Sequence, residues 1–277
     1  MNKNNKNRAF LKWAGGKYSV LEHILPHLPK APKLIEPFFG AGSISLNAQY
    51  ESYQLNDINA DLINLYKFVQ TSCEKFIEAL TPLFTPESNT SAYYYQCRKE
   101  FNATEDPFRR AILFVYLNRH GYNGLCRYNQ KGGFNVPFGR YVKPKLPIQE
   151  IRFFSKRFAQ AQFTNLDYVD VLNNAPENSI IYCDPPYIPI SKTASFTQYA
   201  ATGFNLDAQE TLANTIKKVV SERLVTVVIS NHDTPLSRQL YKGASFKSFY
   251  ARRFISQHAH TRKPVKELLA IFSNENI

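Results

Sequence analysis

The sequence predicts an α/β fold in which an open, mainly parallel sheet is interrupted by a mainly helical insertion that carries a β-hairpin. Three observations support this fold class. Short apolar runs end abruptly in glycine, aspartate or asparagine, as buried parallel strands with ligand-binding ends do. A stretch of helical periodicity lies between two of these runs, and a long central stretch lacks the alternation of strand and helix.

The expected parallel strands are short runs that end in polar or glycine positions. We place them at residues 34–38, 53–55, 180–183 and 225–229. The second run ends in Asn56-Asp57, and Asp184 follows the third run directly. Before the fourth run, four apolar residues recur at helical spacing: Leu212, Ile216, Val219 and Val220. Residues 268–272 form a further strand, so crossover helices pack on an open sheet.

The central stretch divides the chain into three parts. Residues 1–59 and 148–277 form the two halves of the sheet domain, and residues 60–147 form the insertion. Helical spacing of apolar residues continues through the insertion until residue 117, and turn-forming glycines at 121–139 then indicate a hairpin.

Composition narrows the class of protein. The 277 residues carry a net charge of +12 and a pI of about 9.4, which favours a polyanionic partner and nucleic acid above others. No apolar run is long enough to span a membrane, and the first residues lack a signal peptide's apolar core, so we expect a cytosolic protein. We also expect a monomer in solution. The four cysteines form no C-x-x-C pair, so no metal site is predicted.

The positive charge is concentrated in the insertion. Between Pro107 and Gln149 there are no acids and eight cations: Arg109, Arg110, Arg119, Arg127, Lys131, Arg140, Lys143 and Lys145. Tyrosines, phenylalanines and glycine turns are interleaved with them from residue 121 onward. A basic, aromatic hairpin is typical of a nucleic-acid contact, whereas a plain charge run usually marks a solvated surface.

Residues 36–43 and Asp57 predict an adenosine-type ligand. The glycines after the first strand allow a ligand to approach the backbone and open a candidate helix, and Asp57 can bind ribose hydroxyls. The dinucleotide fingerprint requires a third glycine where Ser45 stands, which disfavours a nicotinamide or flavin enzyme. Gly16-Lys17 does not complete a phosphate loop, because Leu11 and Tyr18 occupy its other required positions.

The most specific motif is Asp184-Pro185-Pro186-Tyr187, directly after an apolar strand. Proline has no N–H, so this turn can present carbonyl oxygens beside the Asp184 carboxylate. Together they can accept both hydrogens of an exocyclic amine, which draws the nitrogen toward tetrahedral geometry and frees its lone pair for attack. Tyr187 offers a flat surface on which a base can stack.

These motifs together resemble the DNA adenine-N6 methyltransferases of the Dam type. The resemblance covers nearly the whole chain and rests on RAFLKWAGGKY at 8–18, LNR at 117–119, GYNGLCRYN at 121–129, FNVPFGRY at 134–141, DPPY at 184–187 and SNHD at 230–233. It implies a Rossmann-like methyltransferase sheet with an inserted DNA-recognition domain. It also implies S-adenosylmethionine as cofactor and methylation of the flipped adenine in duplex GATC.

The resemblance assigns roles to matching positions. The catalytic residues it implies are Asp184, Pro185, Pro186 and Tyr187. The cofactor would be bound by Trp13, Lys17, Phe39, Gly40, Gly42, Asp57 and Asp184. DNA would be contacted by Lys12, Arg119, Tyr122, Asn123, Leu125, Arg127, Pro137 and Arg140. His120 stands where the family carries tyrosine and receives no role.

Two other functions stay open at this stage. An amino-methyltransferase of RNA or of a protein amide could use the same turn, and a non-catalytic DNA-binding protein could use the same hairpin. The intact Asp57 and Asp184 disfavour a non-catalytic DNA-binding protein. The acid-free segment favours duplex DNA over RNA or a protein amide as the substrate. The resemblance allows either a solitary enzyme linked to replication and mismatch repair or the partner of a restriction nuclease.

Overall fold

The structure is a computed structural model, and it describes residues 6–188, 204–251 and 264–274. The chain forms two compact units, each assembled from separate stretches of sequence. Unit 1 comprises Met1–Tyr18, Gly40–Asn47 and Asn59–Asn165, and unit 2 comprises Ser19–Phe39, Ala48–Ile58 and Leu166–Ile277. The predicted insertion at 60–147 falls within unit 1, and its bounds as a separate domain stay a prediction.

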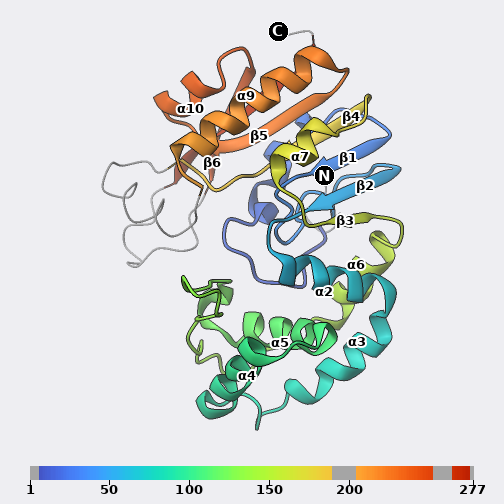
Figure 1. Cartoon of the computed structure of the whole chain (residues 1–277), viewed down its shortest axis with the longest axis vertical. Helices are drawn as coiled ribbons and strands as arrows, with labels where there is room; N and C mark the ends of the chain where they lie inside the picture. The colour runs from blue at the N-terminus through green and yellow to red at the C-terminus, as the bar shows by residue number, and fades with distance from the viewer. Residues whose placement is uncertain (1–5, 189–203, 252–263, 275–277) are drawn as a thin grey trace. The chain divides into compact units, whose positions relative to one another are not determined.

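Unit 2 is built on a twisted sheet with the strand order β2-β1-β4-β5-β7-β6 (Figure 1). Its strands are β1 (Lys33–Glu36), β2 (Ser52–Asn56), β4 (Ser179–Cys183), β5 (Thr226–His232), β6 (Ser245–Ala251) and β7 (Val265–Phe272). Strands β2, β1, β4 and β5 are parallel, which confirms the four predicted strands. Strand β7 is also present, but it runs antiparallel to β5 and to β6.

Strand β4 lies at the centre of the parallel part of the sheet. All five of its residues are buried, and it pairs with β1 on one side and with β5 on the other. Ile181 is opposite both Ile35 and Val227. A strand covered on both faces and paired on both edges has one available register, because a shift by one residue would reverse every side chain.

The helical elements assigned to unit 2 cover this sheet. They are α1 (Leu21–Ile24), η3 (Leu25–His27), α7 (Tyr168–Asn173), α9 (Leu206–Glu222) and α10 (Pro235–Leu240), and η2 (Lys17–Val20) leads into them. Helix α9 lies along β5 in Figure 1, and its four predicted apolar positions belong to the core of unit 2. Asn205 caps it by accepting a hydrogen bond from the Ala208 N–H at 2.9 Å.

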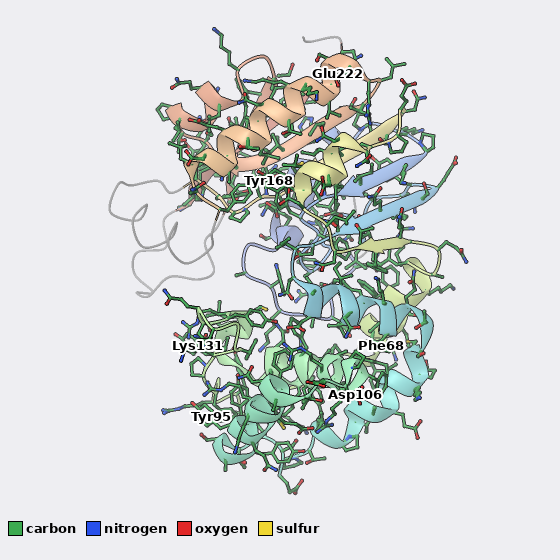
Figure 2. All side chains as sticks on the ribbon, in the orientation of Figure 1. Phe68, Tyr95, Asp106, Lys131, Tyr168 and Glu222 are labelled. Carbon is green, nitrogen blue, oxygen red and sulfur yellow. The ribbon has the colours of Figure 1, made fainter. Side chains whose placement is uncertain are left out.

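Unit 1 is mainly helical. Its elements are α2 (Ala60–Thr71), α3 (Cys73–Leu80), η4 (Thr81–Leu83), α4 (Ser91–Ala103), α5 (Pro107–His120), η5 (Tyr122–Gly124), α6 (Ile148–Arg157) and β3 (Gln162–Thr164). Helix α5 is buried along most of its length, and its side chains meet those of α2 and α4 in the interior of unit 1 (Figure 2). Asp106 caps it, and Pro107 supplies the first helical residue.

The predicted hairpin is present in an irregular form. Its two arms are joined by isolated antiparallel bridges, Gly121 to Phe138 and Tyr128 to Phe134, without a continuous ladder. Four backbone hydrogen bonds cross between the arms, among them Tyr122 N–H to the Pro137 carbonyl at 2.8 Å. Since a two-stranded hairpin alone is marginal in water, this one needs outside support.

One local expectation was wrong, and one strand was not predicted. Residues 40–47 form a series of turns and not the expected helix, because Gly40 and Gly42 have φ values of +50° and +73°, in the left-handed region. The edge strand β6 was not predicted at all. Its side chains are mostly exposed or half-buried, so no apolar run marks it in the sequence.

The described residues contain neither a helix that could span a membrane nor a cluster of side chains that could bind a metal ion. No helix in these ranges is both long and apolar enough to cross a membrane. The same part of the chain contains no group of three or more His, Cys, Asp or Glu side chains that could hold a metal ion.

Candidate active site

The Asp-Pro-Pro-Tyr turn begins directly at the carboxyl end of β4. Ligands of open α/β sheets bind at this end of the strands, so the turn lies where a reacting group is expected. Asp184 is half-buried, Pro185 is buried and Pro186 is exposed, so the turn rises from the core to the surface within three residues. The Tyr187 hydroxyl donates a hydrogen bond to Oε2 of Glu267 on β7 at 3.2 Å.

The neighbours of Asp184 stay protonated at neutral pH. Burial raises the pKa of the Tyr187 hydroxyl well above its usual value, and the Asp184 carboxylate raises it further. Burial likewise raises the pKa of the Cys183 thiol, with Asp184 again contributing. Both groups therefore remain protonated and cannot act as proton acceptors at neutral pH.

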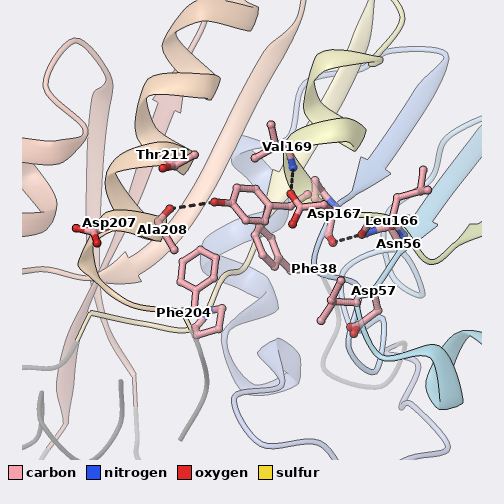
Figure 3. Close-up of a pocket in the computed structure, with 14 residues that line it drawn as sticks. Phe38, Asn56, Asp57, Leu166, Asp167, Val169, Phe204, Asp207, Ala208 and Thr211 are labelled. Atoms are coloured by element: carbon pink, nitrogen blue, oxygen red, sulfur yellow. Dashed lines mark hydrogen bonds between the residues drawn. The ribbon is translucent and has the colours of Figure 1, made fainter. Parts of the chain in front are cut away.

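A cavity of about 560 Å³ opens in unit 2, and Pro186 forms part of its wall. Sites for small ligands and cofactors typically have volumes of roughly 300–1,000 Å³. Phe38, Tyr168 and Phe204 line the cavity, and Figure 3 labels Phe38 and Phe204. The ring centroid of Phe38 lies 5.2 Å from that of Tyr168 and 5.7 Å from that of Phe204. Such rings provide an apolar surface for a flat heterocycle.

Acidic residues line other parts of the same cavity. Asp57 follows β2, and Asp167 precedes α7, which it caps by accepting the Val169 N–H at 2.8 Å. The buried Asn56 joins the surrounding loops, since its amide donates to the Pro37 and Leu166 carbonyls, both at 3.0 Å. The cavity thus combines aromatic rings with carboxylates that can bind hydroxyl or amino groups.

The predicted cofactor residues of unit 2 lie at or near this cavity. Asp57 lines it, and Asp184 stands two residues before Pro186 in its wall. Phe39 is buried, and its neighbour Phe38 is the residue that lines the cavity. The sequence analysis did not single out Phe38, because neighbouring phenylalanines carry no signal of which one faces a ligand.

The other predicted cofactor residues belong to unit 1. Gly40 lies against Trp13, so closely that a Cβ on Gly40 would approach the indole nitrogen to 2.7 Å. Lys17 is buried, and its Nζ donates to the Gly15 carbonyl at 2.6 Å. Gly42 occupies the left-handed turn described above. The cofactor roles of these residues stay predictions.

Asp167, Tyr168 and Phe204 are among the cavity residues that sequence reasoning missed. The Tyr168 hydroxyl donates to the Ala208 carbonyl at 3.1 Å, which fixes its ring in the wall (Figure 3). The sequence signal for Asp167 and Tyr168 was an acidic residue followed by an aromatic one shortly after β3. Phe204 lies just before α9 and carries no comparable signal.

All eight residues predicted to contact DNA belong to unit 1. Five of them are exposed: Tyr122, Asn123, Arg127, Pro137 and Arg140. The other three, Lys12, Arg119 and Leu125, are half-buried. On the hairpin, Arg127 Nε donates to Asn135 Oδ1 on the opposite arm at 2.7 Å, so its guanidinium is ordered before any ligand binds.

Side chains of α4 hold one arm of the hairpin. The Tyr94 hydroxyl and the Arg98 guanidinium both donate to the Val136 carbonyl, at 3.0 and 3.1 Å. The Asn102 amide accepts the Phe134 N–H at 2.8 Å and donates to the Phe134 carbonyl at 3.1 Å. These contacts replace the missing ladder, and they join residues more than thirty positions apart, which sequence reasoning could not pair.

Helix α2 holds the other arm beside Arg127. The Tyr128 hydroxyl donates to Asp61 Oδ2 at 2.6 Å, and the Arg110 guanidinium contacts both oxygens of the same carboxylate, at 2.5 and 3.0 Å. Burial raises the pKa of Tyr128, so the hydroxyl remains a donor.

In the folded protein, acidic side chains from outside residues 107–149 lie beside cations of this segment. Arg109 pairs with Glu100 at 2.6 Å and Arg110 pairs with Asp61, and both carboxylates come from outside residues 107–149. The expected local field therefore comes from fewer cations than the sequence indicates.

Lys12 is held against the hairpin of residues 121–139. The Asn118 side chain accepts the Lys12 N–H at 2.9 Å and donates to the Lys12 and Gly124 carbonyls at 2.7 and 3.0 Å. Gly124 touches the Lys12 side chain, and a Cβ there would approach Lys12 Cβ to 2.2 Å. Lys12 Nζ lies 3.6 Å from the centroid of the Tyr141 ring. Burial, with Arg119 contributing, lowers the pKa of Lys12 to about 8.

His120 is part of the helical core. Its ring stacks on Tyr116 with centroids 4.1 Å apart, and Nδ1 lies 3.0 Å from the Tyr116 carbonyl. Burial lowers the pKa of His120 to about 4, so the imidazole is neutral at pH 7. A packing role suits a position where the resembling family carries another aromatic residue.

The fold places a nucleotide-sized cavity and the Asp-Pro-Pro-Tyr turn at the carboxyl ends of the parallel strands, an arrangement that suits an α/β methyltransferase. The chain belongs to the family described as D12 class N6 adenine-specific DNA methyltransferase, whose model matches residues 13–255. A DNA adenine methylase of Escherichia coli (strain K12) is 52% identical over 267 residues, 96% of each chain. Another, from Vibrio cholerae, is 50% identical over 268 residues, 97% of each chain. A third, from Serratia marcescens, is 49% identical over 267 residues, 96% of this chain and 99% of the relative.

The Lys12 environment predicts a pH dependence of DNA binding. Because the pKa of Lys12 is lowered to about 8, the ammonium loses its proton between pH 7 and 9.5, where an ordinary lysine stays charged. Affinity for duplex DNA, measured by fluorescence anisotropy, should fall several-fold over this range in the wild type. Lys12→Arg, which keeps its charge, should show a much flatter profile. Parallel profiles for the two proteins would contradict a DNA contact by a titrating Lys12.

Proposed function

We propose that the protein transfers the methyl group of S-adenosylmethionine to the N6 amine of adenine in duplex GATC. The observation that carries the proposal is the Asp184 turn at the end of the central strand, with Pro186 in the wall of a nucleotide-sized cavity. The relatives reported above, about half identical along nearly the whole chain, support adenine in DNA as the acceptor. The GATC target comes from the resemblance of the recognition hairpin.

The cavity suits the adenosyl part of the cofactor. Asp57 is placed at a strand end to bind ribose hydroxyls, and the rings of Phe38 and Tyr168 offer apolar surfaces to the adenine. Asp167 adds an acceptor for an amino group. When bound, S-adenosylmethionine supplies an electrophilic methyl group on a sulfonium. For Trp13, Lys17, Gly40 and Gly42, the cofactor role is proposed from the resemblance alone.

The acceptor amine is proposed to bind at the turn. The Asp184 carboxylate accepts one N6 hydrogen, and a proline carbonyl accepts the other. The Pro186 carbonyl already accepts a hydrogen bond from Gln209 at 2.6 Å, so we assign the second contact to Pro185. Two acceptors held in this way orient the nitrogen lone pair toward the methyl group, and fixed orientation supplies much of the rate acceleration.

Proton transfer requires no strong base in this scheme. The N6 amine would become acidic only as the new N–C bond forms and the bond between the methyl group and the donor sulfur breaks, and the Asp184 carboxylate would then take the proton. The adenine must leave the duplex first, which costs a few kcal/mol and is offset by stacking on Tyr187 and by the contacts of the turn.

Recognition of the target is proposed for the hairpin and Lys12. Arg127 binds the second guanine through O6 and N7, and Lys12 contacts the first. Leu125 and Pro137 contact the thymine methyl group. Tyr122 and Asn123 fill the position that the adenine leaves, and Arg140 and Arg119 bind phosphates. The exposure of Tyr122 and Arg127 supports these roles.

Labelled S-adenosylmethionine tests the proposal directly. The full-length protein is incubated with duplexes that contain or lack GATC, with RNA and with a glutamine peptide. We expect label only in the GATC duplex, on adenine N6. Label in RNA or peptide alone would indicate the other amino-methyltransferase, and DNA binding without any transfer would indicate a non-catalytic protein.

Asp184→Ala should abolish turnover, because the variant loses one of the two acceptors that orient the amine. A preorganised contact of this kind contributes about 3–4 kcal/mol at the transition state, so the single-turnover rate should fall at least 100-fold. DNA binding, measured by gel shift, should persist. Activity within about threefold of the wild type would contradict the assigned role.

Arg127→Ala should lower discrimination at one base pair of the target. The expected loss is roughly 1–3 kcal/mol, confined to duplexes that carry the matching guanine. Methylation rates on a set of single-base variants of GATC measure this, with Lys131→Ala on the same hairpin as control. Uniform weakening on all duplexes would instead make Arg127 a phosphate contact.

A further inference from the structure

The carboxyl-terminal half of the catalytic turn is bound by a cluster of buried side chains. Gln209 on α9 is fully buried, and its Nε2 donates to the Pro186 carbonyl at 2.6 Å. Asn231 on β5 is also fully buried, and its Oδ1 accepts the Ile188 N–H at 3.0 Å. The next residue, His232, bonds the Ile188 carbonyl through Nδ1 at 2.8 Å.

The members of this cluster also bind one another. Asn231 Nδ2 donates to the Tyr241 hydroxyl at 2.9 Å and approaches Gln209 Oε1 at 3.4 Å. The Tyr241 hydroxyl in turn donates to Gln209 Oε1 at 3.4 Å. Because each side chain directs its neighbour, the amide of Gln209 points its nitrogen toward Pro186 and its oxygen toward the other two.

The backbone of the turn is not part of the strand ladder. The β4 ladder ends with Cys183 opposite Ile229, and Pro185 and Pro186 have no N–H with which to extend it. A buried polar cluster of this kind is costly to form unless every member is bonded, so it is retained where it fixes a geometry. Here it fixes the backbone two residues after Asp184.

We propose that Gln209 is a positioning residue for methyl transfer, acting with Asn231 and Tyr241 to hold the Pro186 carbonyl. Through that contact the cluster sets the separation between the Asp184 carboxylate and the Pro185 carbonyl, and so the orientation of the amine. This inference rests on the proposed function. It accounts for the Asn231 of the Ser230-to-Asp233 motif, to which the resemblance assigned no role.

The test compares Gln209→Met with Glu210→Ala in the full-length protein. Methionine keeps the volume and flexibility of glutamine but cannot donate to Pro186, and Glu210 is the exposed next residue on α9. Four quantities are measured: the single-turnover rate on a GATC duplex, the Kd for DNA, the Kd for S-adenosylmethionine and the unfolding temperature. Displacement of a catalytic group by about 1 Å can cost on the order of 100-fold in rate.

We expect Gln209→Met to lose 10- to 100-fold in single-turnover rate, with both Kd values within about twofold of wild type and the unfolding temperature little changed. Glu210→Ala should match the wild type. A rate within threefold of wild type, or a rate lost only together with binding and unfolding temperature, would overturn the positioning role. An inactive wild type would instead defeat the proposed function.

Tyr241→Phe provides a second variant should Gln209→Met fail to fold. It removes a single hydroxyl, the one that bonds Asn231 and Gln209, and leaves the ring in the core. We expect a three- to tenfold loss of single-turnover rate at unchanged Kd for both ligands. No loss of rate in this folded variant would overturn the proposal.

Discussion

The position of the Asp184 carboxylate depends on the register of β4 between β1 and β5. Every residue of β4 is buried, and both edges are paired, so the strand can neither shift nor twist out of the sheet. Its last residue therefore fixes where the acidic turn begins. The cavity lined by Asp57 lies at the same end of the sheet, because β2 runs parallel to β1. Parallel strand ends thus bring a nucleotide-sized cavity and the Asp184 turn together in one unit.

Target recognition depends on a different kind of support. The hairpin has only isolated bridges of its own, and its two arms are held by α4 and by Asp61 on α2. These bonds are made to backbone groups and to the hydroxyl of Tyr128, beside Arg127. The backbone of the hairpin is therefore fixed while the Tyr122 and Arg127 side chains stay exposed. The arrangement separates the residues that position the hairpin from those proposed to read DNA.

The strand positions, and the place of the acidic turn at the end of a strand, could be predicted from the sequence. Burial on both faces leaves a continuous apolar run that ends in polar residues, as at Asp57 and Asp184. Features set by distant partners could not. Asp61 neutralises Arg110 from outside the basic segment, and Gln209 reaches the turn from α9, with no local signal in either case. The edge strand β6 and the antiparallel direction of β7 also follow from tertiary pairing rather than from local pattern.

We propose above all that the turn after β4 binds an exocyclic amine through the Asp184 carboxylate and the Pro185 carbonyl. A crystal structure of the protein with a GATC duplex and an unreactive analogue of the methyl donor measures this most directly. The account predicts that adenine N6 lies about 2.7–3.2 Å from both an Asp184 carboxylate oxygen and the Pro185 carbonyl oxygen. An extruded adenine whose N6 lies beyond hydrogen-bonding distance of that carboxylate would contradict it.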